Sequence, residues 1–153
     1  MKHEPRNTLQ SGSSLKEAEK IIILIHGRGA SAESILTLAQ EFRPDETACY
    51  LAPAATGHAW YPYSFMAPRS QNEPWLSSAL DMLDALVKQC LEAGKSAGQI
   101  VLAGFSQGAC LATEFASRRA ARYGGVIGFS GGLIGREIAR ENYSGDFKGT
   151  PVF

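Results

Sequence analysis

The clearest candidate for chemistry in this sequence is a serine between two closely spaced glycines. Residues 104–108 read Gly-Phe-Ser-Gln-Gly, which is the spacing G-x-S-x-G with Ser106 at its centre. A serine at a sharp turn from a strand into a helix needs small neighbours, because the backbone doubles back closely there and the Oγ atom projects above the sheet. Such a serine is a nucleophile for acyl transfer when a base, normally a histidine, takes its proton. The pattern therefore predicts Ser106 as a catalytic nucleophile.

The same spacing occurs a second time, at residues 128–132, with Ser130 at its centre. The residues that follow it include Gly131, Gly132 and Gly135. Glycine is a poor residue with which to begin a helix. We therefore interpret Ser130 as part of a structural turn at the edge of a pocket.

A third glycine-rich junction, at residues 27–32, follows an apolar run and has two interpretations. Its loose G-x-G-x-x-A pattern is compatible with a nucleotide-binding α/β domain, but that site requires an acidic residue at the end of the next strand. The next strand ends Leu51-Ala52-Pro53, without a carboxylate. As an oxyanion loop, the same segment places the backbone N–H of Arg28 beside that of Gln107, and both would stabilise negative charge on a carbonyl oxygen. His26 ends the apolar run, and we expect it to shape the loop by hydrogen bonding.

The hydrophobic pattern predicts the elements that hold these residues. Strands are expected at 8–10, 21–25, 48–52, 100–105 and 125–129, with a further strand beginning at 151. Helices are expected from Ser31 to a stop at Pro44, from Pro74 to Gly94, and over 107–120. This alternation predicts an α/β fold with a mostly parallel sheet and helices on both faces, as one domain over residues 1–153.

Composition narrows the functional class. The 153 residues are 44% hydrophobic and 20% charged, and 15 basic residues balance 15 acidic ones. A net charge of zero gives no electrostatic reason to expect nucleic acid as a partner. No apolar run reaches the roughly 20 residues of a membrane span. Cys49, Cys90 and Cys110 lack metal-ligand spacing and predict reduced thiols in a cytoplasmic protein.

Four segments resemble the phospholipase/carboxylesterase family of α/β-hydrolases, which includes acyl-protein thioesterases and lysophospholipase-like enzymes. They read ILIHGRGA at 23–30, YLAP at 50–53, AGFSQGA at 103–109 and GFSGGL at 128–133. The resemblance implies a cofactor-free, metal-free serine hydrolase that cleaves small-molecule carboxylic esters or thioesters through an acyl-enzyme on Ser106. It also implies that the amides of Arg28 and Gln107 are the oxyanion donors.

An aromatic loop over residues 60–75 is either a cover for the sheet or a wall of the substrate pocket. Trp60, Tyr61 and Phe65 are its candidate pocket residues. The resemblance favours Trp60 and Tyr61 near the acyl site, because the family carries a similar aromatic pair in this loop.

The sequence departs from the family in two ways. Position 28 is often apolar in the thioesterases, whereas Arg28 carries a charge that would favour anionic esters. The family places an aspartate and a histidine after the nucleophile, but His58 is the last histidine here and Asp146 the only aspartate after Ser106. We therefore expect an incomplete domain that lacks the C-terminal strands and helix and does not turn over esters alone. Its open sheet edge would favour aggregation or a homodimer. A catalytically inactive hydrolase-fold binding module is the alternative.

Overall fold

The chain forms a five-stranded sheet in the order β1-β3-β2-β4-β5, and the computed structural model describes residues 2–41 and 45–153. The strands are β1 (Thr8–Gly12), β2 (Lys20–Ile25), β3 (Ala48–Pro53), β4 (Ile100–Phe105) and β5 (Gly125–Phe129). Only β1 runs antiparallel, along β3. The predicted strands are thus confirmed, and the one begun at residue 151 is a single parallel bridge between Val126 and Val152.

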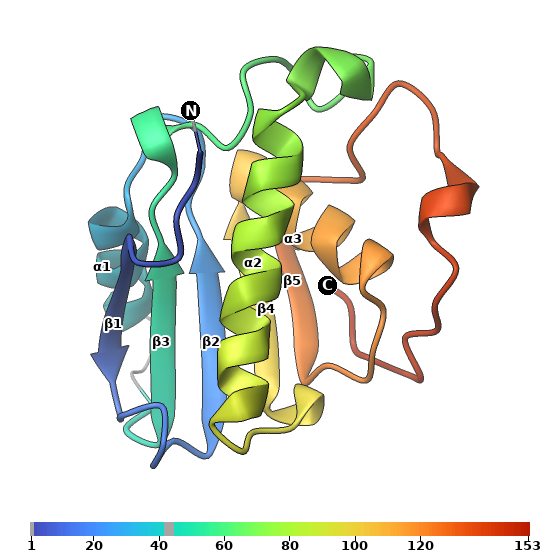
Figure 1. Cartoon of the computed structure of the whole chain (residues 1–153). Helices are drawn as coiled ribbons and strands as arrows, with labels where there is room; N and C mark the ends of the chain where they lie inside the picture. Colours follow the sequence, from blue (N-terminus) through green and yellow to red (C-terminus); the bar gives the residue numbers. More distant parts are fainter. Residues whose placement is uncertain (1, 42–44) are drawn as a thin grey trace.

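Helices cover both faces of this sheet, as predicted (Figure 1). Helix α1 (Ala32–Glu41) packs against β1, β2 and β3 on one face, and its predicted stop at Pro44 lies outside the described residues. Helices α2 (Trp75–Glu92) and α3 (Gln107–Arg118) lie together on the opposite face. None of the helices in the described residues is both long enough and apolar enough to cross a membrane.

The two faces of β2 explain how the sheet is held between these layers. Ile21, Ile23 and Ile25 are fully buried in the main core with α2 and α3, whereas Leu24 packs in a smaller cluster with α1. Side chains of a strand alternate between faces, so a run of five apolar residues serves both layers at once. The continuous apolar run is therefore what fixes β2 in the middle of the sheet.

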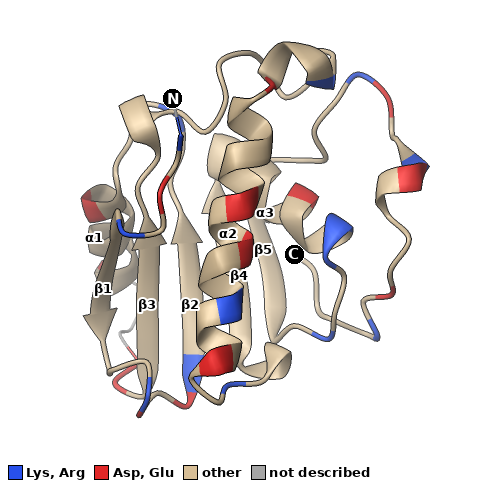
Figure 2. Cartoon of the chain, in the orientation of Figure 1, with Lys and Arg blue, Asp and Glu red and all other residues tan. Residues whose placement is uncertain are grey.

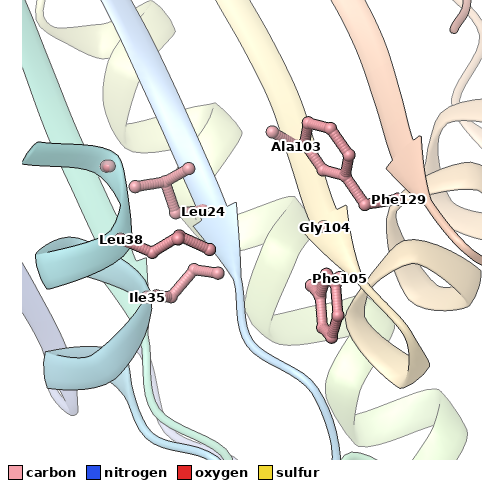
Figure 3. A pocket seen from close by; sticks show the side chains of 8 residues that line it. Leu24, Ile35, Leu38, Ala103, Gly104, Phe105 and Phe129 are labelled. Carbon is pink, nitrogen blue, oxygen red and sulfur yellow. The ribbon is translucent and has the colours of Figure 1, made fainter. Parts of the chain in front are cut away.

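The face that carries α1 is only partly covered. An apolar groove of about 290 Å³ lies between α1 and the neighbouring strands (Figure 3). Its lining consists of Leu24, Ile35, Leu38, Ala39, Ala103, Gly104, Phe105 and Phe129. Phe105 and Phe129 are 49% and 55% exposed, because α1 does not extend over β4 and β5.

The charged side chains lie almost entirely outside the sheet. Lys20 is the only charged residue within the five strands, and the others are distributed over helices and loops (Figure 2). Lys20 pairs with Asp45 at 2.7 Å, at the end of the sheet where β2 begins. Any charge at the opposite end, where β2 and β4 finish, must therefore come from the loops or the helices.

Candidate active site

Ser106 occupies a strained turn between β4 and α3. Its backbone has φ 52° and ψ −117°, a conformation that non-glycine residues rarely adopt. A Cβ atom on Gly104 would lie 2.1 Å from the carbonyl oxygen of Gly108, and one on Gly108 would lie 2.1 Å from that of Ile25. Both flanking glycines are therefore required by close backbone approach, which is the physical reason for the G-x-S-x-G spacing.

The loop after β2 meets this turn. Ile25 pairs with Gly104 across β2 and β4, so the chain segments that leave these two strands are neighbours. A Cβ atom on Gly27 would lie 3.5 Å from the Cβ of Ser106. The sheet order also reverses between β2 and β4, because the chain continues from β2 to β3 on one side and from β4 to β5 on the other. Crevices at such reversal points are the usual ligand sites of open α/β sheets.

Two backbone amides at this crevice are available to a ligand. Among the described residues, the N–H groups of Arg28 and Gln107 have no protein acceptor. Gln107 begins α3, whose first amides point out of the helix with its positive dipole end. Unpaired amides beside Ser106 are the arrangement that an oxyanion requires.

The side chain of Gln107 ties the nucleophile turn to the aromatic loop. Its Oε1 accepts from the backbone N–H of Trp60 at 2.9 Å, and its Nε2 donates to the carbonyl of Tyr61 at 2.8 Å. Gln107 is 6% exposed, so these bonds form in a largely dry environment where they hold the loop firmly. The sequence contains no local signal for this role of the Gln107 side chain. The G-x-S-x-G spacing predicts a function only for the backbone N–H of Gln107.

The cavity at Ser106 has a volume of about 240 Å³ and includes two of the three aromatic residues predicted for it. Its lining consists of Arg28, Tyr61, Tyr63, Ser64, Phe65, Ser106, Gln107, Cys110 and Ser130. Tyr61 and Phe65 both line this cavity. Ser130 also lines the cavity, and it lies in a turn that no α-helix follows in the described chain.

Trp60 is not among the residues that line this cavity. It is fully buried behind the cavity, and its indole N–H donates to the carbonyl of His26 at 2.8 Å. Its ring lies between those of His26 and His3, at centroid distances of 5.1 and 5.4 Å. A buried indole needs a hydrogen-bond acceptor, and the carbonyl of His26 supplies it.

Two buried histidines hold these loops together. The ring of His26 contacts the carbonyl of Gly27 through Nδ1 at 2.7 Å and accepts from the N–H of Ala55 through Nε2 at 3.0 Å. His3 contacts the carbonyl of Trp60 through Nε2 at 2.9 Å and accepts through Nδ1 from the N–H of Thr56 at 3.0 Å. Each ring therefore donates once and accepts once, which only a neutral imidazole can do.

Burial lowers the pKa of both His3 and His26, and the backbone hydrogen bond of each opposes this shift only in part. Because protonation favours the unfolded chain, their contribution to stability is complete above the ordinary histidine pKa of 6.5 and is lost as the pH falls below it. We therefore expect the urea midpoint to fall between pH 7 and pH 5. His3→Gln should lower the midpoint at pH 7 but flatten this acid loss, because glutamine does not take up a proton in this range. An unchanged slope in His3→Gln would contradict the assignment.

A buried carboxylate outside the motifs joins α3 to the segment that follows Ser130. Glu114 on α3 is fully buried and accepts from Arg118 Nε at 2.7 Å, from the N–H of Ile134 at 2.9 Å and from the hydroxyl of Tyr143 at 2.8 Å. These bonds fasten the segment after Ser130 to the helix that begins beside Ser106. In the described residues, no three His, Cys, Asp or Glu side chains converge as metal ligands.

The sequence and the structure match known proteins over most of the chain. Residues 11–153 match the phospholipase/carboxylesterase family. A crystal structure of a phospholipase/carboxylesterase from Dyadobacter fermentans has 47% sequence identity and a TM-score of 0.95, and the match covers 100% of this chain and 72% of that chain.

Two curated relatives are yeast acyl-protein thioesterases 1. The one from Yarrowia lipolytica is 24% identical over 148 residues, which are 86% of this chain and 65% of the relative. The one from Saccharomyces cerevisiae is 26% identical over 166 residues, with 96% of this chain and 73% of the relative covered. The chain thus spans about two thirds of the length of the first of these relatives.

Proposed function

Because the chain belongs to the phospholipase/carboxylesterase family of α/β-hydrolases, we propose that it is a serine hydrolase of carboxylic esters or thioesters. The observation that carries this proposal is the strained Ser106 turn with the unpaired amides of Arg28 and Gln107 beside it. The cavity at this turn is about 240 Å³, which suits a small acyl group or part of a longer one. The thioester alternative is supported by the thioesterase relatives. The buried free thiols of its three cysteines fit a reducing cytoplasm.

In the proposed reaction, Ser106 Oγ attacks the carbonyl carbon of the substrate while a base takes the hydroxyl proton. The carbonyl oxygen becomes an oxyanion that accepts from the N–H groups of Arg28 and Gln107. Collapse of this intermediate breaks the ester or thioester bond, and the leaving alcohol or thiol receives the proton from the base. Water then attacks the acyl-enzyme in the same way and releases the acid.

The base for this reaction is not evident among the described residues. Both ring nitrogens of His3 and of His26 are engaged with the backbone, and His58 contacts the carbonyl of Ala30 through Nδ1 at 2.9 Å. Asp146 accepts from the N–H of Lys148 in an exposed turn. We therefore propose that the base and its acid partner lie outside the described residues, in a segment such as the relatives carry beyond the matched length.

A chimera tests both parts of this proposal. Residues 1–153 are joined, after Phe153, to whatever part of the Dyadobacter relative follows its matched region, and hydrolysis of p-nitrophenyl butyrate is compared with that by residues 1–153 alone. We expect turnover by the chimera and none above background by the short chain, since a serine hydroxyl without a base stays protonated. Turnover by the short chain would place the base among its own three histidines. A folded chimera that binds the ester without turnover would favour the non-catalytic binding module.

A further inference from the structure

Arg28 lines the cavity that contains Ser106 and joins the loop after β2 to the aromatic loop. Its guanidinium leaves the loop after β2 and donates from Nη1 to the carbonyl of Pro62 and from Nη2 to the carbonyl of Tyr63, both at 2.9 Å. These two bonds use two of the five N–H donors of an arginine. The remaining donors are exposed to solvent or to a molecule in the cavity.

The charge of Arg28 is not neutralised by the protein. The ion pairs of the described residues do not include Arg28, and the residues outside the description, Met1 and residues 42–44, contain no acid. The other eight residues that line the cavity are neutral side chains. Pro62 and Tyr63 contribute carbonyl dipoles, which orient the guanidinium without cancelling its charge.

The field of Arg28 extends into the cavity. Burial raises the pKa of the Tyr61 hydroxyl well above its usual range, and the positive charge of Arg28 opposes this rise. Tyr61 therefore stays protonated at neutral pH. The serine hydroxyls of Ser64 and Ser130 add groups that can donate to an oxygen anion.

From this juxtaposition we propose that Arg28 forms a carboxylate subsite beside Ser106, so that the site prefers esters whose acyl or leaving group bears a carboxylate. A guanidinium already fixed by two carbonyls loses little side-chain freedom when it binds such a group. That the ligand is an ester rests on the proposed function, whereas the anion preference rests on Arg28 alone.

Binding to residues 1–153 tests the subsite without any need for hydrolysis. Monoethyl succinate and diethyl succinate are matched in their ester and chain but differ in one negative charge. Their dissociation constants are measured by NMR from the amide shifts of the cavity residues, at low salt and at 0.3 M salt. We expect the monoester to bind more tightly, and the ratio of the two affinities to fall roughly fivefold in Arg28→Met and also at high salt. Arg136→Met makes the same change in net charge at an exposed arginine that does not line the cavity, and it should leave the ratio unchanged.

Three results would overturn the subsite. One is an affinity ratio near one in the unmodified chain, and another is no saturable binding of the monoester at the cavity. The third is an equal loss of both ligands in Arg28→Met, which would show that Arg28 only holds the aromatic loop in place. Failure of the chimera to hydrolyse esters would instead count against the proposed function and leave these binding results valid.

Discussion

Replacing Ser106 with alanine in the chimera is expected to lower kcat for p-nitrophenyl butyrate by roughly 10⁴- to 10⁶-fold, with a much smaller change in KM. The variant keeps the amides of Arg28 and Gln107 but removes the oxygen that forms the acyl-enzyme. Alanine is no harder to accommodate than serine at φ 52°, so the turn should persist. Steady-state kinetics together with circular dichroism would separate lost chemistry from lost folding.

Ser130→Ala is the matched control, because Ser130 lies in the same cavity, in the same G-x-S-x-G spacing and also at positive φ. No α-helix follows it in the described chain, so its hydroxyl does not lie at the N-terminus of an α-helix as that of Ser106 does. We expect a change in kcat of about threefold or less. An inactive Ser130 variant beside an active Ser106 variant would reverse the assignment of the nucleophile.

Gly108→Ala should destabilise the chain by about 3 kcal/mol or more. Helix propensity alone favours the opposite sign, since Gly108 lies in α3 and alanine is the better helix former by about 1 kcal/mol. The added Cβ would however lie 2.1 Å from the carbonyl oxygen of Ile25 and 2.5 Å from that of His26, and both oxygens belong to backbone that cannot rotate away. We therefore expect the steric conflict to dominate.

Urea unfolding of Gly108→Ala and of Gly98→Ala measures this effect. Around Gly98 the nearest atoms that a Cβ would meet are 3.8 Å away, which is ordinary contact distance. The control should change the free energy of unfolding by about 0.5 kcal/mol or less. Equal free energies of unfolding of the two variants would contradict this prediction, because they would mean that β2 and α3 can move apart at this contact without loss of stability.

Those parts of the molecule that depend on local pattern could be predicted from the sequence. The run of Ile21 to Ile25 indicates a strand buried on both faces, and the structure packs it between two layers. Pro74 and Gly94 bracket α2 within two residues at each end. The glycines around Ser106 indicate a close backbone approach, which the structure shows at 2.1 Å.

The remaining features depend on contacts between residues distant in the sequence. The family resemblance favours Trp60 near the pocket, but its indole donates to the carbonyl of His26, which is 34 positions away in the sequence. His3 and Glu114 have no motif around them, and they become important only where folding gives them buried partners. The local pattern of a single sequence does not indicate which distant residues will form such hydrogen bonds.

The central pairing of the sheet also determines when the site can assemble during folding. β2 and β4 are neighbours through contacts such as Ile21 with Ile100, so nearly 80 residues must be looped out before these strands meet. Closing such a loop costs conformational entropy, and this cost comes before the contacts between the strands can offset it. Folds that depend on contacts between residues far apart in the sequence therefore fold slowly. Helices α1 and α2 can form while β2 still lacks β4. The loop of Arg28 and the Ser106 turn follow these two strands, so they meet only when this long loop closes, and neither segment forms the proposed site without the central pairing of the sheet.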